Sequence, residues 1–459
     1  MRGVLIAGPA SGVGKTSIAL AIAAGMRARG LRVQAFKCGP DFLDAGHLSA
    51  VTERPALNLD GWMLDRNGIC EAFAEGNADA EMAVVEGMMG LFDGISGEGE
   101  KGSAAEIAKI LSLPVVFVVN ASKSARSIAA VIRGFEVFDP ELRFAGVVLN
   151  GVASEKHYRL LADAIAENCG MPILGWVPPQ TGVHIPERHL GLQTASEIDW
   201  DKKRHAFEIL AKERLNLDLL LSPKFQVEPC KVAVSTVDSE PRVTIGVARD
   251  AAFCFYYQDN LNLLERAGAK LVEFSPLKDA ALPAGVDGLY FGGGYPELYV
   301  SQLSANLALA GEIREFAASG LPVYAECGGM MYLGERLRTR DGQAHAMAGV
   351  LPIESEMTDK LVRFGYVGLE LQRDCLLGVQ GTVLRGHSFH HSRSSNTCDL
   401  APAFKAHYTL SGATTEEGYA SGNVFASYIH LHFRGATEIA ERFVALAEQA
   451  ARRLVGVRG

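Results

Sequence analysis

Short apolar runs alternate with longer, partly polar segments along the first 180 residues of the chain. Runs such as 3–7 and 115–119 are apolar throughout instead of alternating with polar residues. Strands of this kind are buried on both faces, as in a parallel sheet covered by helices. Segments such as 17–29 are long enough for the crossover helices that parallel strands require. The pattern predicts an α/β domain. The alternation continues with predicted strands at 32–36, 83–85 and 145–149.

The pattern stops at about residue 180 and begins again at 243–248, which is followed by a helix-like segment and another apolar run at 288–291. Between them lies a charged, helix-like stretch at 201–221 and then three prolines, which is typical of a connection between domains. A chain of 459 residues is also too long for one core. We therefore expect three parts: a domain at 1–180, a connecting segment at 181–241 and a second α/β domain at 242–459.

Composition narrows the class of protein. A formal net charge of −9 argues against nucleic-acid binding, which needs an excess of Lys and Arg. No apolar run approaches the roughly 18 residues of a membrane-spanning helix, and the N-terminus enters a predicted strand at once. We expect a cytoplasmic protein without a membrane partner. The eight cysteines include no CxxC pair, so neither a zinc site nor a redox dithiol is indicated.

A glycine-rich segment at 8–16 follows the first predicted strand and opens a predicted helix. Glycines allow backbone N–H groups to approach phosphates, Lys15 can reach the β and γ oxygens, and the Thr16 hydroxyl can bind Mg²⁺. The alternative is a tight turn without a ligand, which the Gly-Lys-Thr ending disfavours. The candidate nucleotide-binding residues are Gly8, Gly12, Val13, Gly14, Lys15, Thr16 and Ser17. Gly8 lies six residues before Gly14, and the segment resembles the longer loop of dethiobiotin-synthetase-like P-loop enzymes.

Acidic residues follow several of the predicted strands in this half. Parallel sheets bind ligands beyond the carboxyl ends of their strands, so these side chains should face the phosphates. We assign Asp41 and Glu86, with Thr16, to Mg²⁺. We assign Asp44 and Asp93 to the side of an acid substrate. Taken singly, each acid could equally cap a helix or remain solvated.

The second half contains one cysteine in the setting of a nucleophile. An apolar run at 323–325 leads into Glu326-Cys327-Gly328, a strand-to-turn arrangement typical of a nucleophile elbow. His430 lies in a strand-like run about a hundred residues later and could act as the base that activates the thiol. The alternatives are a buried structural cysteine and a core histidine.

A glycine run follows the predicted strand at 288–291 and could expose backbone N–H groups to a cavity. Together with the N–H after the nucleophile, it would form an oxyanion hole for acyl transfer. The candidates are Gly293, Gly294 and Gly328. Three histidines at 387, 390 and 391 have no carboxylate or cysteine at ligand spacing, so we prefer a structural or substrate-lining role to zinc.

Cysteine and nucleotide chemistry in one chain indicate an amidotransferase, in which one site frees ammonia and the other activates an acid with ATP. The whole chain resembles the cobyrinic acid / hydrogenobyrinic acid a,c-diamide synthase family. The resemblance implies an N-terminal P-loop domain of the dethiobiotin-synthetase-like kind with a parallel sheet, and a C-terminal class I glutaminase-like α/β domain. The segments that carry it are 8–16, 37–44, 57–60, 86–87, 90–94, 292–297, the Cys327 elbow, 385–387 and 427–430.

The resemblance also implies a reaction. Such an enzyme amidates the a and c carboxylates of a corrinoid, using one ATP and one glutamine for each in cobalamin biosynthesis. Cys327 would attack glutamine, His430 would carry the proton, and ammonia would travel to a corrinoid acyl phosphate formed with ATP and Mg²⁺. Ala325 stands where class I glutaminases have glycine, and His432 stands where they have the glutamate of the triad. Either a dyad acts or another group orients His430. A homodimer is left open.

Three rival functions share parts of this pattern. Nickel-sirohydrochlorin a,c-diamide synthases and cobyric acid synthases resemble the chain in both halves, and the motifs do not reveal the metal in the macrocycle. A partition-type ATPase switch would carry a lysine near the start of the phosphate loop, where this chain has Pro9 and Ala10. Such a switch would also have no use for Cys327.

Overall fold

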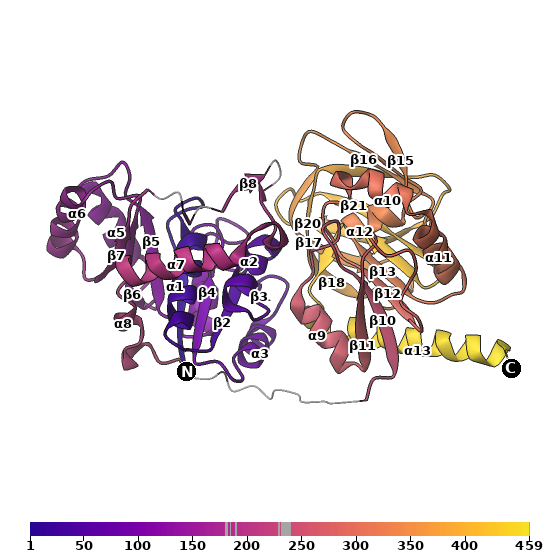
Figure 1. Cartoon of the computed structure of the whole chain (residues 1–459), viewed down its shortest axis with the longest axis horizontal. Coiled ribbons are helices and arrows are strands. Elements are labelled where there is room, and N and C mark those ends of the chain that lie inside the picture. The colour runs from indigo at the N-terminus through magenta and orange to yellow at the C-terminus, as the bar shows by residue number, and fades with distance from the viewer. Residues whose placement is uncertain (180–181, 184, 189–190, 228–229, 231–239, 459) are drawn as a thin grey trace. The chain divides into compact units, whose positions relative to one another are not determined.

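The computed structural model describes residues 1–459 with the exception of 180–181, 184, 189–190, 228–229, 231–239 and 459 (Figure 1). The chain forms two compact units, Met1–Ser235 and Thr236–Gly459. No helix in the described part of the chain has the length and apolarity that a membrane crossing requires.

The first unit is built on a parallel sheet of seven strands. In their order across the sheet, the strands are β3 (Leu57–Leu59), β2 (Val33–Cys38), β4 (Met82–Glu86), β1 (Arg2–Ala7), β5 (Val115–Asn120), β6 (Phe144–Asn150) and β7 (Ile173–Val177). The four central strands β2, β4, β1 and β5 are almost wholly buried, including the polar Gln34 and Lys37 of β2. A small antiparallel pair completes the unit, β8 (Glu187–Arg188) and β9 (Gly191–Leu192).

Helices cover both faces of this sheet and form a separate apolar core on each. One face carries α1 (Lys15–Ala28), α2 (Phe42–Thr52), α7 (Trp200–Arg214) and α8 (Leu217–Leu220). The other carries α3 (Arg66–Gly76), α4 (Ala104–Ile110), α5 (Ser127–Phe138) and α6 (Glu155–Asn168). Two short 3₁₀ turns, η1 (Ala195–Glu197) and η2 (Pro223–Phe225), lie beside α7 and α8 in sequence. The predicted α/β fold with a P-loop parallel sheet is confirmed.

Helix α7 lies within the stretch 181–241 that the sequence assigns to a connection, and in the structure it packs along α1 (Figure 1). Phe207, Leu210 and Ala211 form one buried stripe on an otherwise charged helix and join the core of the first unit. Gly25 on α1 permits the close approach, because a Cβ there would lie 2.6 Å from the Ala211 Cβ. A single apolar stripe is all that such a surface helix needs to dock.

The second unit contains a mixed sheet of ten strands and a smaller sheet of four. The large sheet runs in the order β11 (Ala269–Phe274), β10 (Val243–Ala248), β12 (Gly288–Phe291), β13 (Val323–Glu326), β22 (Val424–Ser427), β21 (Thr414–Ser421), β20 (Pro402–Tyr408), β17 (Arg363–Leu371), β18 (Val383–His390) and β23 (His430–Leu431). The first five are parallel and the remainder antiparallel. The small sheet is β15 (Ala344–Ala346), β14 (Arg336–Arg338), β16 (Ile353–Met357) and β19 (Ser392–Asn396).

The course of the chain after β22 shapes the second unit. Only Tyr428 and Ile429 separate β22 from β23, yet β22 pairs with β13 and β23 pairs with β18. The antiparallel half of the sheet therefore curls back and brings β18 to the carboxyl ends of the parallel strands. The helices of this unit are α9 (Gln258–Arg266), α10 (Val300–Ala305), α11 (Leu307–Ala318), α12 (Gly328–Leu333) and α13 (Glu438–Arg458), with 3₁₀ turns η3 (Pro296–Leu298) and η4 (Phe433–Gly435).

We predict that Phe207→Ala lowers the free energy of unfolding of the first unit by about 3–5 kcal/mol, because it removes a fully buried aromatic ring from the contact between α7 and α1. Ile209→Ala on the same helix is the control, since Ile209 is 42% exposed and should cost under about 1 kcal/mol. Urea denaturation of the full chain measures both. Equal effects would contradict the placement of α7 in this core.

Candidate active sites

The phosphate loop connects β1 to α1 in a conformation that only glycine adopts without strain. Gly12 and Gly14 have φ angles of 75° and 100°, in the left-handed region. A Cβ on Gly14 would also lie 2.2 Å from the Nδ2 atom of Asn150, which donates a hydrogen bond to the Val13 carbonyl. Gly14 provides no side-chain cap for α1, so the N–H groups of the first turn remain available to an anion.

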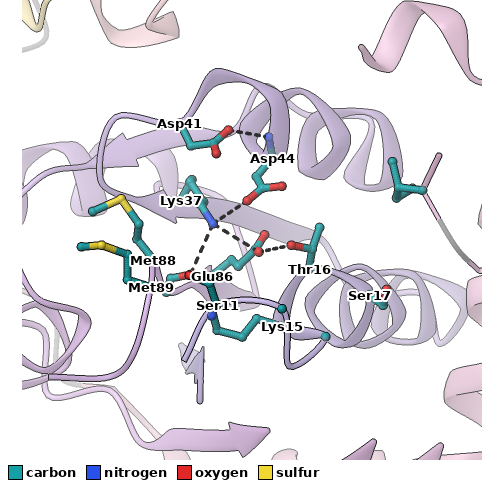
Figure 2. A pocket seen from close by; sticks show the side chains of 14 residues that line it. Ser11, Lys15, Thr16, Ser17, Lys37, Asp41, Asp44, Glu86, Met88 and Met89 are labelled. Carbon is teal, nitrogen blue, oxygen red and sulfur yellow. Dashed lines mark hydrogen bonds and ion pairs between the residues drawn. The ribbon is translucent and has the colours of Figure 1, made fainter. Parts of the chain in front are cut away.

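A pocket of about 370 Å³ opens above this loop, at the carboxyl ends of β1, β2 and β4 (Figure 2). Of the predicted nucleotide-binding residues, Gly8 at the start of the loop and the buried Val13 are not among those that line the pocket. The remaining five line the pocket, namely Gly12, Gly14, Lys15, Thr16 and Ser17. The Lys15 Nζ atom donates to the Ala10 carbonyl at 2.9 Å, and burial together with the nearby Lys37 ammonium lowers the pKa of Lys15.

A second lysine at this site is a residue that the sequence analysis missed. Lys37 lies near the end of β2, with its Nζ atom 2.6 Å from Asp44 Oδ2 and 3.2 Å from Glu86 Oε1 (Figure 2). The Thr16 hydroxyl donates to the same Glu86 oxygen at 2.5 Å. The structure therefore brings Thr16, Asp44 and Glu86 together around one buried cation. The signal that could have identified Lys37 was a lysine between apolar residues at the carboxyl end of a predicted strand.

The charges in this cluster are strongly coupled. Burial and the Asp44 carboxylate raise the pKa of Glu86 to about 7, against the opposing effects of Lys37 and Thr16. Burial would also raise the pKa of Asp44, but its contact with Lys37 lowers it overall. The pKa of Lys37 is raised, because the attraction of Asp44 and Glu86 outweighs the effect of burial. Lys37 is therefore a permanent cation at neutral pH.

The residues present fit a magnesium ion. Mg²⁺ is usually held by one or two protein oxygens together with substrate phosphates and water. Glu86 Oε2 is a buried oxygen with no hydrogen-bond partner, and Thr16 lies beside the same carboxylate. Within the described residues, no three His, Cys, Asp or Glu side chains are arranged to hold a metal by themselves. The fit therefore depends on phosphate oxygens as further ligands.

Asp41 lines the same pocket and lies beside Asp44 (Figure 2). Its carboxylate accepts the Asp44 N–H at 2.9 Å and caps α2, the structural alternative for this acid. Burial and the neighbouring Asp44 raise the pKa of Asp41 to about 6.

Asp93 shapes a loop next to the phosphate loop. Its Oδ2 atom accepts the Gly90 N–H at 2.8 Å, and the side chain is otherwise exposed. The Leu91 N–H donates to the Gly8 carbonyl at 2.8 Å, so this loop is anchored to the start of the phosphate loop. Asp93 thus lies on a loop beside the phosphate loop and is not among the residues that line the pocket.

In the second unit, Cys327 occupies the sharp turn between β13 and α12. Its φ and ψ angles are 47° and −105°, a strained conformation for a residue other than glycine and one typical of nucleophile elbows. The turn needs small neighbours, since a Cβ on Gly329 would lie 2.5 Å from the Phe291 carbonyl oxygen. The Cys327 N–H donates to the Ser427 carbonyl at 2.7 Å and joins the elbow to β22.

His430 lies beside this thiol, at the start of β23, and is almost fully buried. Its Nδ1 atom is 3.2 Å from Oε2 of Glu326, a residue the sequence analysis did not select. Burial lowers the pKa of His430, but hydrogen bonds to Cys327 and Glu326 outweigh it and raise the value to about 9. A glutamate in an otherwise apolar strand, directly before the nucleophile, was the signal that could have identified it.

The three glycines predicted for an oxyanion hole differ in their contacts. The Gly293 N–H donates to the Phe255 carbonyl at 3.2 Å, so this N–H is not free to face the cavity. Gly293 is instead required for space, because a Cβ there would lie 2.5 Å from the His430 Cε1 atom. The Gly294 nitrogen lies 3.0 Å from the position of a Cβ on Gly328, so the two other predicted amides are adjacent.

Three further histidines of the second unit, His387, His390 and His432, stack on other rings. The His387 ring stacks on His430 with centroids 5.0 Å apart, its Nδ1 lies 3.1 Å from the Tyr257 hydroxyl, and burial lowers its pKa well below the usual value. The His390 ring stacks on Tyr428 at 3.8 Å. His432 stacks on Tyr257 and faces Asp259 at 4.0 Å, whereas Glu326 pairs with His430.

The fold and the two sites define a class of protein in which a nucleotide-binding domain is joined to a glutamine amidotransferase domain. Residues 4–192 match the CobQ/CobB/MinD/ParA nucleotide binding domain, and residues 244–438 match the CobB/CobQ-like glutamine amidotransferase domain.

Similarity to curated proteins extends over nearly the whole chain. The cobyrinate a,c-diamide synthase of Syntrophotalea carbinolica is 44% identical, with 96% of this chain and 97% of that protein covered. The synthases of Dehalococcoides mccartyi and Salmonella typhimurium are each 40% identical, with 97% of this chain and 98% of each relative covered. The chain belongs to the cobyrinate a,c-diamide synthase family, which confirms the resemblance inferred from the motifs.

We predict that Gly293→Ala lowers glutamine-dependent activity by at least about 10-fold, because the new methyl group displaces the His430 ring. Synthesis from ammonium salts should be retained. Gly311→Ala on α11 is the control, since the nearest atom to its Cβ is the end of the Arg314 side chain at 3.8 Å. Steady-state kinetics with each nitrogen source measure both variants. Normal glutamine use by Gly293→Ala would contradict the proximity of the two residues.

Proposed function

We propose that the protein uses ATP and glutamine to amidate the a and c carboxylates of cobyrinic acid or its metal-free counterpart, hydrogenobyrinic acid. The observation that carries this proposal is the 40–44% identity to named cobyrinate a,c-diamide synthases across both units. Such identity over both sites supports a shared reaction more strongly than either site alone. ATP and glutamine are substrates of cytoplasmic metabolism, and we place the enzyme in the cytoplasm.

The glutaminase half supplies ammonia. The Cys327 thiolate attacks the amide carbon of glutamine, and the amides of Gly294 and Gly328 stabilise the tetrahedral oxyanion. His430 donates a proton to the departing ammonia and then removes one from the water that hydrolyses the thioester to glutamate. Its raised pKa of about 9 keeps it protonated and ready to act as the acid at neutral pH.

The nucleotide half activates the substrate. A carboxylate oxygen of the corrinoid attacks the γ-phosphorus of ATP, ADP leaves, and the resulting acyl phosphate is attacked by ammonia with release of phosphate. Lys15 and Lys37 neutralise charge on the transferring group. Thr16 and Glu86 would hold Mg²⁺, which supplies further neutralisation of the phosphate charge when bound.

The other acids have supporting roles in this proposal. Asp44 holds Lys37 in place, as their 2.6 Å ion pair suggests, and can also face the substrate carboxylate. Asp41 caps α2 and lines the same pocket, where it can hold a water ligand of the metal. Asp93 keeps the shape of the loop that we place at the corrinoid entrance.

The function is tested by incubating the protein with ATP, Mg²⁺, glutamine and either cobyrinic or hydrogenobyrinic acid, followed by mass analysis. We expect two successive conversions of carboxylate to amide with at least one of these substrates. Amidation of nickel-sirohydrochlorin alone, or ATP hydrolysis without any amide product, would contradict the proposal.

Two substitutions should separate the half-reactions. Cys327→Ser should abolish glutamine-dependent synthesis and leave synthesis from ammonium salts, since only ammonia release needs the thiolate. Lys15→Ala should abolish synthesis from both nitrogen sources, because the acyl phosphate no longer forms. Product formation with each source measures the difference. Loss of both activities in a folded Cys327→Ser protein would contradict the two-site scheme.

Lys37→Met should lower synthesis from either nitrogen source by about 100-fold or more, because a buried cation beside the transferred phosphoryl group is lost. Lys101→Met provides a control, as Lys101 pairs with Glu106 and is 42% exposed. Urea denaturation of the full chain reports whether the first unit of the variant is intact. A Lys37→Met enzyme with wild-type synthesis would show that Lys37 is only a structural counter-ion.

A further inference from the structure

We propose that Glu326, the residue directly before the nucleophile, is the positioning residue of the glutaminase site and fixes the orientation and tautomer of His430. This inference rests on the proposed function, because it concerns the same glutamine-hydrolysing pair. It resolves the open question of what replaces the glutamate that class I glutaminases carry two residues after the histidine.

Three contacts hold the Glu326 carboxylate. Oε2 lies 3.2 Å from the Nδ1 atom of His430. Oε1 accepts the Tyr324 hydroxyl at 2.6 Å and the Leu431 N–H at 3.1 Å. The side chain is 1% exposed, so water does not compete for these bonds. Leu431 directly follows His430 in the chain. The Glu326 carboxylate therefore fixes both the His430 ring and the backbone next to it.

The arrangement determines which ring nitrogen serves the thiol. A carboxylate oxygen can only accept, so the Nδ1 atom of His430 must carry a proton. The Nε2 atom is then the one left for Cys327, to which His430 is also hydrogen-bonded. This is the role of the third member in Ser-His-Asp sites, where loss of the carboxylate favours the wrong tautomer.

His432 occupies the sequence position of the missing glutamate but belongs to another network. Its Nδ1 atom faces Asp259 at 4.0 Å, and its ring stacks on Tyr257 at 4.8 Å. Asp259 in turn forms a bidentate ion pair with Arg434. His432 is therefore a structural residue of the layer behind the site.

The groups that face His430 come from the end of one strand and from a second strand. Cys327 and Glu326 lie at the end of β13, and His387 and His390 lie on β18. Burial lowers the pKa values of both neighbouring histidines, which are neutral at pH 7. Glu326 is therefore the charged partner, besides the thiol, that sustains the imidazolium of His430. Removing the carboxylate should allow His430 to lose its proton at lower pH.

Glu326→Gln tests this role. The Leu431 N–H can only donate, so the amide oxygen of glutamine should turn toward it and the NH₂ group toward His430. The Nδ1 atom must then accept, and the wrong tautomer results. We expect kcat for hydrolysis of L-glutamine to fall by at least about 100-fold, with KM changed much less. The basic limb of the pH profile, near pH 9 in the wild type, should move to lower pH.

Tyr324→Phe is the matched control, because it removes one hydrogen bond to Oε1 and keeps the carboxylate. We expect less than about a 10-fold loss of kcat and an unchanged basic limb. If Glu326→Gln also loses synthesis from ammonium salts, the protein is damaged and Glu326→Asp takes its place. Aspartate retains the negative charge on a shorter side chain. A lowered kcat together with the basic limb of the wild type therefore supports the inference.

The outcomes distinguish failure of the proposed function from failure of the role assigned to Glu326. A wild-type protein that does not hydrolyse glutamine overturns the proposed function itself. Wild-type hydrolysis with Glu326→Gln equal to Tyr324→Phe in kcat and pH profile overturns the role of Glu326 alone. If Glu326→Asp has to be used, a basic limb shifted to lower pH overturns that role as well.

Discussion

The need to neutralise a buried carboxylate at the end of a parallel strand governs both halves of this protein. Glu86 is the last residue of β4 and Glu326 the last of β13, and both side chains are at most 1% exposed. An ionised carboxylate in such a place is very costly unless a cation or several hydrogen-bond donors satisfy it. Lys37 does this for Glu86, and His430 with two further donors does it for Glu326.

The same constraint determines where the two sites lie in their sheets. Parallel strands end at one edge of a sheet, where loops leave space for a ligand. In the first unit the neutralising cation is a lysine, which keeps its charge and suits phosphate transfer. In the second it is a histidine, which can give and take a proton and suits acyl transfer. The carboxyl edge of each parallel sheet thus carries the site for a different step of the same synthesis.

The sequence predicted the features that depend on local pattern. Continuous apolar runs identified the parallel sheet, and the spacing of Gly14, Lys15 and Thr16 identified the phosphate loop. The elbow at Cys327 and the late His430 were recognised from residue type and order. Together with the other motifs they were sufficient to recognise the family.

Features that depend on long-range pairing were missed. Lys37 faces Glu86 because β2 and β4 pair in that register, which no local pattern specifies. Glu326 reaches His430 only because the chain returns after 104 residues and the sheet curls around β23. The occupied N–H of Gly293 depends on the approach of Phe255 from another loop. Helix α7 joined the first unit through a stripe of three apolar residues that is easily overlooked in a charged segment.

In the proposed scheme the nucleotide half activates the substrate by phosphorylation, and ammonia from either source attacks the same intermediate. The most direct measurement uses a corrinoid labelled with ¹⁸O in its carboxylates and follows the label by mass spectrometry of the released phosphate. The account predicts one ¹⁸O transferred to phosphate for every amide formed, with glutamine and with ammonium salts alike. Amide formation without transfer of ¹⁸O to phosphate would contradict it.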